Sequence, residues 1–492
     1  MRFATMIPSL ALGFVPLLRG QETNDLERSI RTFSQVYAAV EAQAADAVNP
    51  NTAIYEAALP SLLRKLDPHS VFFTPAQFDQ LRQMERSTSK GFGTVVSVLP
   101  GRVIILQTMP GAPSAKAGIA PGDEIVAINN LRLDFLEMEQ LVGLLSETRQ
   151  KPARLDIRRP GNARLMQFIL TPEELASPSV DRAFEIRPGI AFVRITSFEG
   201  ETGKQLREAL EKLGGAKLHG LVLDLRNNGG GVISSAFEAA ALFLPAGKKI
   251  VSVRGRARQL EEVAVPGKSE PYTFPVALLV NEKTASASEI LAGALQDHDR
   301  AAILGTTSFG KGLVQSVFPL REGTGIALTT AFYFTPSGRS LQKPLKEGQL
   351  EGSARYANLE AAKEFKTASG RSVKGGGGIE PDIQIFPERP TRLRAVLDAS
   401  GVLTNFAAEF VQKNKVDEGF AVTDNIMDDL QLFLSERNIR PGLSEWSTDR
   451  DWIRNRVQQE IFNLALGVAK GDEVEFRRDP QVLRAVEELG KP

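Results

Sequence analysis

The sequence predicts a multidomain α/β protein with a mixed α/β core, an inserted β domain, and helical N- and C-terminal segments. At 492 residues the chain exceeds the roughly 250–300 residues that one hydrophobic core organises, so we expect several domains. Short apolar runs alternate with helical patterns between residues 180 and 386, which is typical of a largely parallel sheet with crossover helices. Residues 91–171 instead contain short strand patterns separated by glycine turns.

Composition excludes several function classes. Lysine plus arginine equals aspartate plus glutamate, 59 each, and no long basic run occurs, so a nucleic-acid partner is not expected. The absence of cysteine excludes disulfides, thiolate metal sites and a cysteine nucleophile. The three histidines, His69, His219 and His298, are far apart in sequence, so we expect neither a histidine metal site nor any other metal or organic cofactor.

The N-terminus has the pattern of a secretory signal peptide at residues 1–20. Arg2 precedes an apolar stretch from Phe3 to Leu18, which is too short for a membrane-spanning helix. We therefore predict export to the periplasm or cell envelope, with peripheral or no membrane contact.

Two helical segments flank the middle of the chain. Residues 21–88 contain Leu26, Ile30 and Phe33 at helical spacing, and residues 389–492 contain helical patterns such as Ile453 and Val457. We expect the C-terminal domain to serve either in packing or in self-association, which would give a homo-oligomer through helical segments.

The sequence of residues 89–172 predicts a hairpin, two short helices and a closing hairpin. The runs Val95–Val98 and Val103–Leu106 flank the turn pair Pro100-Gly101. The later stretch Gly118-Ile119-x-Pro121-Gly122-Asp123-x-Ile125 resembles a circularly permuted PDZ domain of the kind found in bacterial proteases.

The PDZ resemblance implies a peptide-binding site. The loop Gly91, Phe92, Gly93 and Thr94 would receive a peptide carboxylate on its backbone N–H groups, and the peptide would add as a strand at the domain edge. A purely structural β-turn is the alternative interpretation of this loop.

Residues 173–388 are predicted to form the α/β core. A small-residue run, Asn281-Glu282-Lys283-Thr284-Ala285-Ser286-Ala287-Ser288-Glu289-Ile290, joins a strand at residues 276–280 to a helix at residues 288–296. Such a turn exposes a serine hydroxyl beside the N–H groups of a helix N-terminus, which an oxyanion needs. On the local sequence alone, capping of the helix by Thr284, Ser286 or Ser288 explains the same residues.

Lys311 lies between Gly310 and Gly312, which allow the chain to approach another backbone closely. A lysine buried there has a lowered pKa, and its neutral amine accepts a hydroxyl proton. Gln315 would orient the amine by hydrogen bonding. Taken by itself, Lys311 is equally explained as a solvated lysine on a glycine turn.

The two motifs together, Thr284–Glu289 and Gly310-Lys311-Gly312-x-Val314-Gln315, resemble the C-terminal processing peptidases, which are tail-specific serine proteases with a Ser/Lys dyad and a PDZ domain. Other matching motifs are Leu66-Asp67-Pro68-His69-Ser70, Asp224-Leu225-Arg226-Asn227-Asn228-Gly229-Gly230-Gly231, and Gly378-Ile379-x-Pro381-Asp382.

The resemblance implies a serine endopeptidase that cleaves exported proteins bound by their C-terminal tails. Ser286 would be the nucleophile, Lys311 the general base and Gln315 the orienting residue. Backbone N–H groups of Gly230 or Gly231, together with that of Ala287, would hold the oxyanion. Because the PDZ domain is inserted before the core, we also expect it to gate the site when a tail or an activating adaptor protein binds.

Three alternatives remain from the sequence. The segment 305–312 nearly matches a nucleotide-binding loop, but Gly312 replaces the magnesium-binding hydroxyl and a strand pattern follows. A catalytically inactive PDZ-containing adaptor is the second alternative. A Ser-His-Asp hydrolase is the third, although we expect His298 to lie on a solvated face beside Asp297 and Asp299. Asp224 and Arg226 are expected to be structural.

Overall fold

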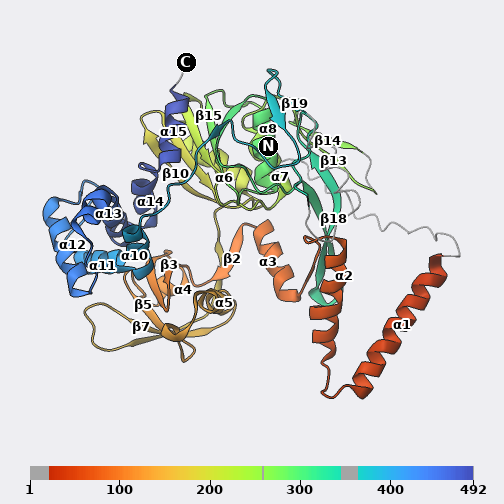
Figure 1. Cartoon of the computed structure of the whole chain (residues 1–492), viewed down its shortest axis with the longest axis horizontal. Helices are drawn as coiled ribbons and strands as arrows, with labels where there is room; N and C mark the ends of the chain where they lie inside the picture. Colours follow the sequence, from red (N-terminus) through yellow and green to blue (C-terminus); the bar gives the residue numbers. More distant parts are fainter. Residues whose placement is uncertain (1–21, 257–259, 345–363, 491–492) are drawn as a thin grey trace. The chain divides into compact units, whose positions relative to one another are not determined.

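The computed structural model describes residues 22–256, 260–344 and 364–490, so the predicted signal peptide lies outside the described residues. The chain divides into two units, residues 1–65 and residues 66–492. The smaller unit contains α1 (Glu22–Gln43), the π-helix η1 (Thr52–Ala58) and most of α2 (Leu59–Leu66) (Figure 1). The prediction of helices here is confirmed. The apolar side chains of Leu26, Ile30 and Phe33 on α1 are more than half exposed.

The core of the larger unit is a sheet with the described strand order β10-β11-β12-β15-β16-β21 (Figure 1). All neighbouring strands are parallel except the pair β10 and β11. The bounds are β10 (Val180–Arg187), β11 (Ile190–Ile195), β12 (Gly220–Asp224), β15 (Val276–Val280), β16 (Ala301–Gly305) and β21 (Ile383–Gln384). Strands β12 and β15 are buried along their whole length, which explains their continuous apolar sequences.

The predicted crossover helices are confirmed and cover one face of this sheet. They are α6 (Thr202–Lys212), α7 (Ile233–Ala241) and α8 (Ala287–Asp297). Leu206 of α6, Ala236 of α7 and Leu291 of α8 share one hydrophobic cluster with the strands.

The opposite face is covered by the end of the chain. Val482 and Val486 of α15 (Pro480–Leu489) pack with Phe192 and Val222, and Phe476 at the end of α14 (Val468–Phe476) joins them. The last helix, which the sequence groups with the C-terminal helical domain, therefore completes the core of the six-stranded sheet.

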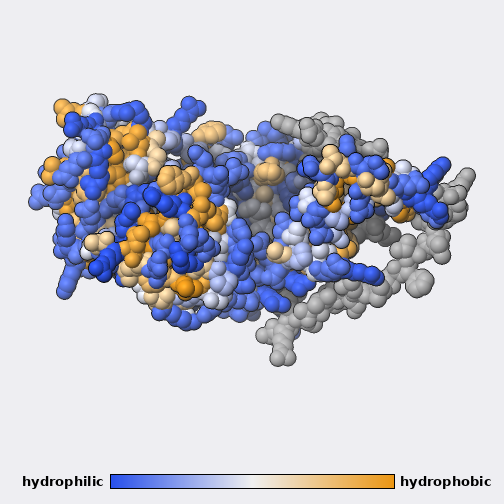
Figure 2. All heavy atoms as spheres, turned by 90° about the horizontal axis from the view of Figure 1, so that it is seen from below, coloured by the Kyte–Doolittle hydropathy of each residue, from blue (hydrophilic) through white to orange (hydrophobic). Residues whose placement is uncertain are grey.

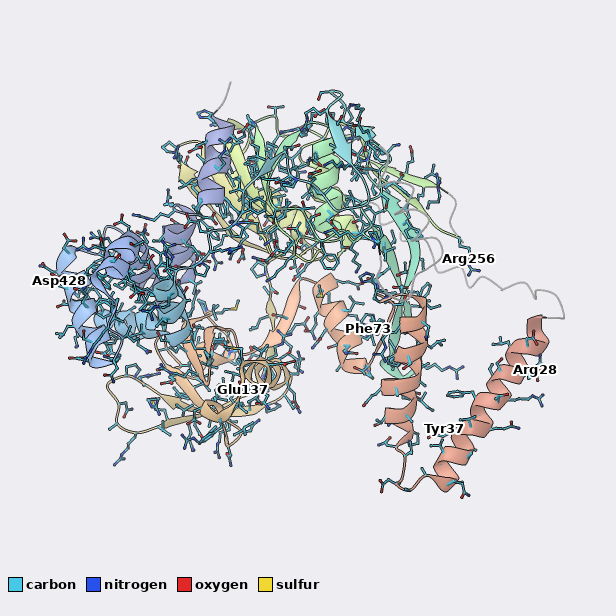
Figure 3. The ribbon with its side chains drawn as sticks, in the orientation of Figure 1. Arg28, Tyr37, Phe73, Glu137, Arg256 and Asp428 are labelled. Carbon is cyan, nitrogen blue, oxygen red and sulfur yellow. The ribbon has the colours of Figure 1, made fainter. Side chains whose placement is uncertain are left out.

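A second sheet joins β1 (Val71–Phe73), β18 (Gly325–Phe334), β13 (Lys249–Arg254) and β14 (Glu261–Ala264), and β17 (Leu313–Pro319) also pairs with β18. Phe73, labelled in Figure 3, stacks on Phe78 of α3 (Pro75–Glu85) with ring centroids 6.4 Å apart. Residues 66–88, which the sequence groups with the N-terminal helices, thus lie in the larger unit. The pairing of β1 with β18 brings the Asp67–Ser70 turn to the same sheet as β17.

The inserted β domain is connected to the rest of the larger unit by the paired antiparallel strands β2 (Thr88–Gly91) and β9 (Glu173–Ala176). Its sheet has the order β3-β4-β5-β7-β8, and within the described residues β3 pairs with no strand other than β4. The bounds are β3 (Thr94–Leu99), β4 (Arg102–Thr108), α4 (Pro113–Lys116), β5 (Glu124–Ile128), β6 (Leu131–Arg132), η2 (Leu133–Phe135), α5 (Met138–Thr148), β7 (Ala153–Arg158) and β8 (Met166–Leu170). Both predicted hairpins are confirmed. Several large apolar side chains of this domain are exposed, including Phe135 and Ile169, and Figure 2 shows apolar and polar residues intermixed on the face that it draws.

The predicted C-terminal helices are also confirmed. They are α10 (Arg392–Ser400), α11 (Val402–Lys413), α12 (Asp424–Glu436) and α13 (Leu443–Ala465), followed by α14 and α15. Phe406, Phe433 and Ile453 belong to a separate hydrophobic cluster. Among the helices of the described residues, none has both the length and the apolarity needed to cross a membrane.

The packing of α15 predicts that a change there weakens the six-stranded sheet. Val482 is fully buried, so Val482→Ala should lower the free energy of unfolding of the core by about 2 kcal/mol. Leu432→Ala on α12 is the matched control, because Leu432 is 64% exposed. Both tryptophans, Trp446 and Trp452, lie in α13, so amide hydrogen exchange in β12 and β15 is the suitable measurement. Equal exchange rates in the two variants would contradict this packing.

Candidate active site

Ser286 occupies a strained turn between β15 and α8. Its backbone angles are φ 56° and ψ −117°, a conformation that residues with a side chain rarely adopt and that costs about 1–3 kcal/mol. Within the described residues its hydroxyl makes no hydrogen bond, so it does not cap the helix. Thr284 Oγ1 donates instead to the Leu225 carbonyl at 2.8 Å, and Ser288 Oγ donates to the Asn228 carbonyl at 3.1 Å.

The glycine loop after β12 lies directly against Ser286. A Cβ atom on Gly230, which has φ 93°, would lie 2.8 Å from the Ser286 Cβ. A Cβ atom on Gly231, which has φ 142°, would lie 2.0 Å from the Phe198 carbonyl oxygen. Only glycine fits these two positions, since other side chains would collide with backbone.

The three predicted oxyanion donors differ in their present partners. The Gly230 N–H donates to Asn228 Oδ1 at 2.9 Å. The N–H groups of Gly231 and Ala287 donate to no atom of the described residues. Gly231 and Ala287 therefore have unused donors, whereas the Gly230 donor is occupied.

Lys311 is held by a chain of hydrogen bonds that reaches the predicted Leu66–Ser70 motif. Its Nζ donates to Gln315 Oε1 at 2.6 Å, and Gln315 Nε2 donates to the His69 carbonyl oxygen. The buried Asp67 carboxylate fixes that turn, because it accepts from the His69 N–H at 2.8 Å and from the Ser70 N–H at 2.9 Å.

The environment of Lys311 makes its amine easier to deprotonate. Burial lowers the pKa of the Lys311 amine below its ordinary value, and the charges of Asp67 and Glu289 oppose that change. Burial and the positive charge of Lys311 also lower the pKa of His69. An amine of this kind is suited to accept a proton from an alcohol.

Glu289 joins the serine turn to the lysine loop. Its fully buried carboxylate accepts hydrogen bonds from the backbone N–H groups of Ser286 at 2.9 Å, Gly310 at 2.7 Å and Lys311 at 2.9 Å, and from Ser308 Oγ at 2.5 Å. The same oxygen, Oε2, accepts from both Ser286 and Lys311. Burial raises the pKa of this carboxyl, and the four hydrogen bonds oppose that rise.

The Ser286 hydroxyl and the Lys311 amine make no hydrogen bond with each other in the described structure. The amine is directed at Gln315 instead. Their backbones are close, because both N–H groups donate to one oxygen of the Glu289 carboxylate.

The structure rules out His298 as a base for Ser286. The two residues lie at opposite ends of α8, which is about 16 Å long, and His298 Nε2 contacts the Lys249 carbonyl at 2.7 Å. The expectation that His298 lies on a solvated face was wrong, because His298 is partly buried at the end of α8. Asp297 is buried and forms an ion pair with the buried Arg339 at 2.8 Å.

The nucleotide-binding alternative is also excluded by the fold. The segment 305–312 leads into the strand β17, whereas a phosphate-binding loop opens a helix. Gly312 serves another purpose, since a Cβ there would lie 2.8 Å from the Gln342 nitrogen. In the described ranges, no group of three or more acidic or histidine side chains is arranged to hold a metal ion.

The Gly91–Thr94 loop has unused donors as well. The Phe92 carbonyl accepts from the Ser114 N–H at 3.0 Å, and the Gly93 carbonyl accepts from the Met109 N–H at 2.8 Å. The N–H groups of Phe92 and Gly93 donate to nothing within the described residues. Gly93 has φ 74°, and a Cβ there would lie 2.2 Å from the Ala112 Cβ.

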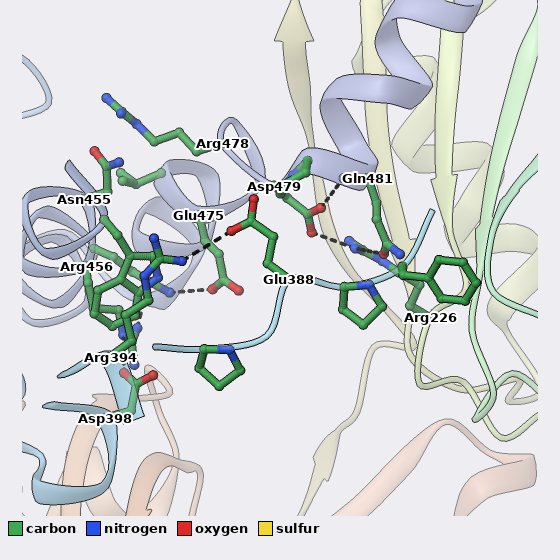
Figure 4. Close-up of a pocket in the computed structure, with 17 residues that line it drawn as sticks. Arg226, Glu388, Arg394, Asp398, Asn455, Arg456, Glu475, Arg478, Asp479 and Gln481 are labelled. Atoms are coloured by element: carbon green, nitrogen blue, oxygen red, sulfur yellow. Dashed lines mark hydrogen bonds and ion pairs between the residues drawn. The ribbon is translucent and has the colours of Figure 1, made fainter. Parts of the chain in front are cut away.

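The charged cavity in Figure 4 lies apart from Ser286, which is not among its lining residues. It has a volume of about 490 Å³ and lies where the start of the glycine loop after β12 meets the C-terminal helices. Arg226 pairs there with Asp479, just before α15, at 2.6 Å (Figure 4). Arg226 also pairs with Asp224 at 2.7 Å. This network anchors the start of the glycine loop to the last helix.

Comparison with known proteins places these features in a family. Residues 189–348 match peptidase family S41, and residues 104–159 match the PDZ domain. The chain is 33% identical to the carboxyl-terminal-processing protease of Synechocystis sp. over 292 residues, which cover 58% of this chain and 68% of that protein. It is 34% identical to the carboxy-terminal-processing protease of Bartonella bacilliformis over 295 residues, covering 59% and 67%. This chain belongs to the carboxyl-terminal-processing proteases.

Among solved structures, the photosystem II D1 C-terminal processing protease is 25% identical and covers 75% of this chain and 94% of its own, with a TM-score of 0.40. The carboxyl-terminal-processing protease described here is a serine-type peptidase with a PDZ domain, as the sequence predicted. The alternative of an inactive adaptor is not favoured.

The sequence pointed to most of the site but missed its connections. It did not assign Glu289 a role, although a glutamate within an otherwise small and apolar run is unusual for a helix that is buried on every side. It also missed Asn228 and Tyr333. The Asn228 amide accepts from the Gly230 N–H of the same loop and donates to the Ile195 carbonyl at 2.8 Å, and the Tyr333 hydroxyl donates to the Lys311 carbonyl of a separate element.

Replacement of Glu289 by glutamine should uncouple the two loops. The amide group keeps one acceptor oxygen and places an N–H₂ donor against backbone N–H donors, so we expect about 1–3 kcal/mol of destabilisation and at least about a 100-fold loss of activity. Glu282→Gln on the exposed part of the same turn is the control. Peptidase assays and thermal unfolding of both variants check this, and full activity of Glu289→Gln would contradict the coupling.

Proposed function

We propose that Ser286 is the nucleophile of this carboxyl-terminal-processing protease, Lys311 its general base and Gln315 the residue that orients the amine. The observation that carries the proposal is the Glu289 carboxylate oxygen shared by the N–H groups of Ser286 and Lys311. Two loops from different elements are thereby held together, with a free hydroxyl on one and a half-buried amine on the other.

The proposed reaction begins when the neutral Lys311 amine turns from Gln315 to the Ser286 hydroxyl and accepts its proton. Oγ attacks the peptide carbonyl, and the N–H groups of Gly231 and Ala287 stabilise the oxyanion. The tetrahedral intermediate collapses as Lys311 returns the proton to the leaving amine of the tail. A water molecule, deprotonated by Lys311, then hydrolyses the acyl-enzyme and restores Ser286.

The PDZ domain is proposed to capture the C-terminal tail of an unstructured substrate protein. The unused N–H groups of Phe92 and Gly93 are donors for a carboxylate, and the free edge of β3 accepts an added strand. Binding of a tail or of an activating adaptor protein would shift this domain and so gate the site, since β2 and β9 are its two connections to the core.

Export to the periplasm or cell envelope is part of the proposal, on the basis of the signal-peptide pattern at residues 1–20. Self-association through the helical segments is a further part. It is supported by the exposed apolar residues of α1, such as Leu26 and Ile30.

The lowered pKa of Lys311 predicts the pH dependence. A base works only when it is unprotonated, so kcat/KM should rise with pH through a midpoint below the ordinary lysine value of 10.5. Lys311→Ala should abolish activity, and Lys311→Arg should do so too because a guanidinium keeps its proton. Lys283→Ala, an exposed lysine in the serine turn, is the control. Robust turnover by Lys311→Ala would refute the assignment of the base.

Ser286→Ala tests the nucleophile directly. Wild type should shorten a disordered test protein from its C-terminal end, and fragment masses should locate the cuts, while Ser286→Ala should bind the same protein without cutting it. Amidation of the test protein's C-terminal carboxylate should raise KM because it removes the charge that the Gly91–Thr94 loop would bind. Cleavage by Ser286→Ala would show that another group attacks the peptide.

A further inference from the structure

Tyr333, near the end of β18, makes two hydrogen bonds to the Lys311–Gly312 segment. Its backbone N–H donates to the Gly312 carbonyl at 3.0 Å, and its hydroxyl donates to the Lys311 carbonyl. The side chain is fully buried, and burial raises the pKa of its hydroxyl well above the ordinary value, so the group remains a donor.

The same hydroxyl reaches the serine turn. Its oxygen lies 3.3 Å from the Ser286 carbonyl oxygen. Tyr333 thus contacts the carbonyl groups of Ser286 and Lys311, whereas Glu289 accepts the N–H groups of both. Two side chains from different elements, α8 and β18, therefore hold the two backbones from opposite sides.

We propose that Tyr333 is a positioning residue for the reaction, whose hydroxyl sets the separation between the Ser286 turn and the Lys311 loop. The inference rests on the roles proposed above for Ser286 and Lys311. Tyr333 acts through their backbones and does not touch the substrate.

The local backbone explains why such a contact is needed. Lys311 lies between Gly310, at φ 87°, and Gly312, and the β17 ladder begins only at Leu313. The lysine backbone is therefore outside regular structure, and its N–H and carbonyl groups bond to the side chains of Glu289 and Tyr333. A misplacement of about 1 Å between reacting groups typically costs about 100-fold in rate.

The chain offers a matched control in Tyr272. This residue is also buried, and its hydroxyl donates to Glu211 of α6, away from the Ser286 turn. Tyr272→Phe and Tyr333→Phe each delete the hydroxyl of one buried tyrosine, and only Tyr333→Phe removes the contacts with the Lys311 and Ser286 carbonyls. Any effect confined to Tyr333→Phe therefore comes from the location of the hydroxyl.

The test compares these two variants, wild type and Ser286→Ala in the full-length protein, with a peptide tail as substrate. We expect Tyr333→Phe to lower kcat by about 10- to 100-fold with KM within about twofold of wild type. Because a loosened Lys311 loop is better solvated, the midpoint of the pH–rate profile of Tyr333→Phe should move toward the ordinary lysine value. The titratable groups that face Lys311, which are Asp67, His69 and Glu289, are the same in both proteins. Tyr272→Phe should leave kcat, KM and the pH profile within about twofold of wild type.

Unchanged kcat in Tyr333→Phe, an equal loss in Tyr272→Phe, or a change in KM alone would overturn the inference. So would a Tyr333→Phe protein that does not fold, because the hydroxyl would then serve the whole core. Folding is checked by thermal unfolding and by the near-ultraviolet spectrum. Ser286→Ala separates the two hypotheses: activity in that variant refutes the proposed nucleophile, whereas an inactive Ser286→Ala with a fully active Tyr333→Phe refutes only the positioning role.

Discussion

The buried carboxylate of Glu289 is the interaction on which the site depends. A charged group in a fully buried position is costly unless every lone pair finds a donor. Glu289 finds four, and three of them are backbone N–H groups of Ser286, Gly310 and Lys311. The carboxylate can be satisfied only when the serine turn and the lysine loop are both in place. The same hydrogen bonds therefore stabilise the buried charge and hold the two loops of the site together.

The rest of the larger unit supports this assembly from several directions. The Asp67 carboxylate shapes the turn whose His69 carbonyl receives Gln315, and the pairing of β1 with β18 brings that turn to the lysine. On the other side of the sheet, the ion pairs of Arg226 with Asp224 and Asp479 connect the glycine loop to α15. Segments from both ends of the larger unit thus converge on the loops around Ser286.

The Lys311 amine and the Ser286 hydroxyl make no hydrogen bond with each other in the part of the chain that the structure describes. Lys311 donates to Gln315, and the Ser286 hydroxyl has no partner among the described residues. The Glu289 carboxylate holds the backbones of both residues, and the proposed proton transfer needs the amine to turn from Gln315 to the hydroxyl. Exposed side chains rotate within picoseconds to nanoseconds, and the rotation of the half-buried Lys311 side chain breaks its hydrogen bond to Gln315.

Local patterns in the sequence determined the strands, the helices and the motif residues of this protein. The apolar runs of β12 and β15, the turn pair at Pro100-Gly101 and the glycines around Lys311 act through backbone preferences that neighbouring residues decide. The sequence also led to Ser286, Lys311 and Gln315, because their spacing and residue types resemble a known family.

Only the tertiary structure decided which groups meet. The sequence could not show that Glu289 and Tyr333 hold the Lys311 backbone, that Asn228 occupies the Gly230 donor, or that α15 covers the six-stranded sheet of the core. It also predicted a solvated face for His298, which is partly buried, and its neighbour Asp297 is buried against Arg339. Except for the bond between Asn228 and Gly230, which lie in one loop, each of these contacts joins residues from separate elements. A pairing of that kind depends on how sheets and helices pack, which the periodicity of one segment does not encode.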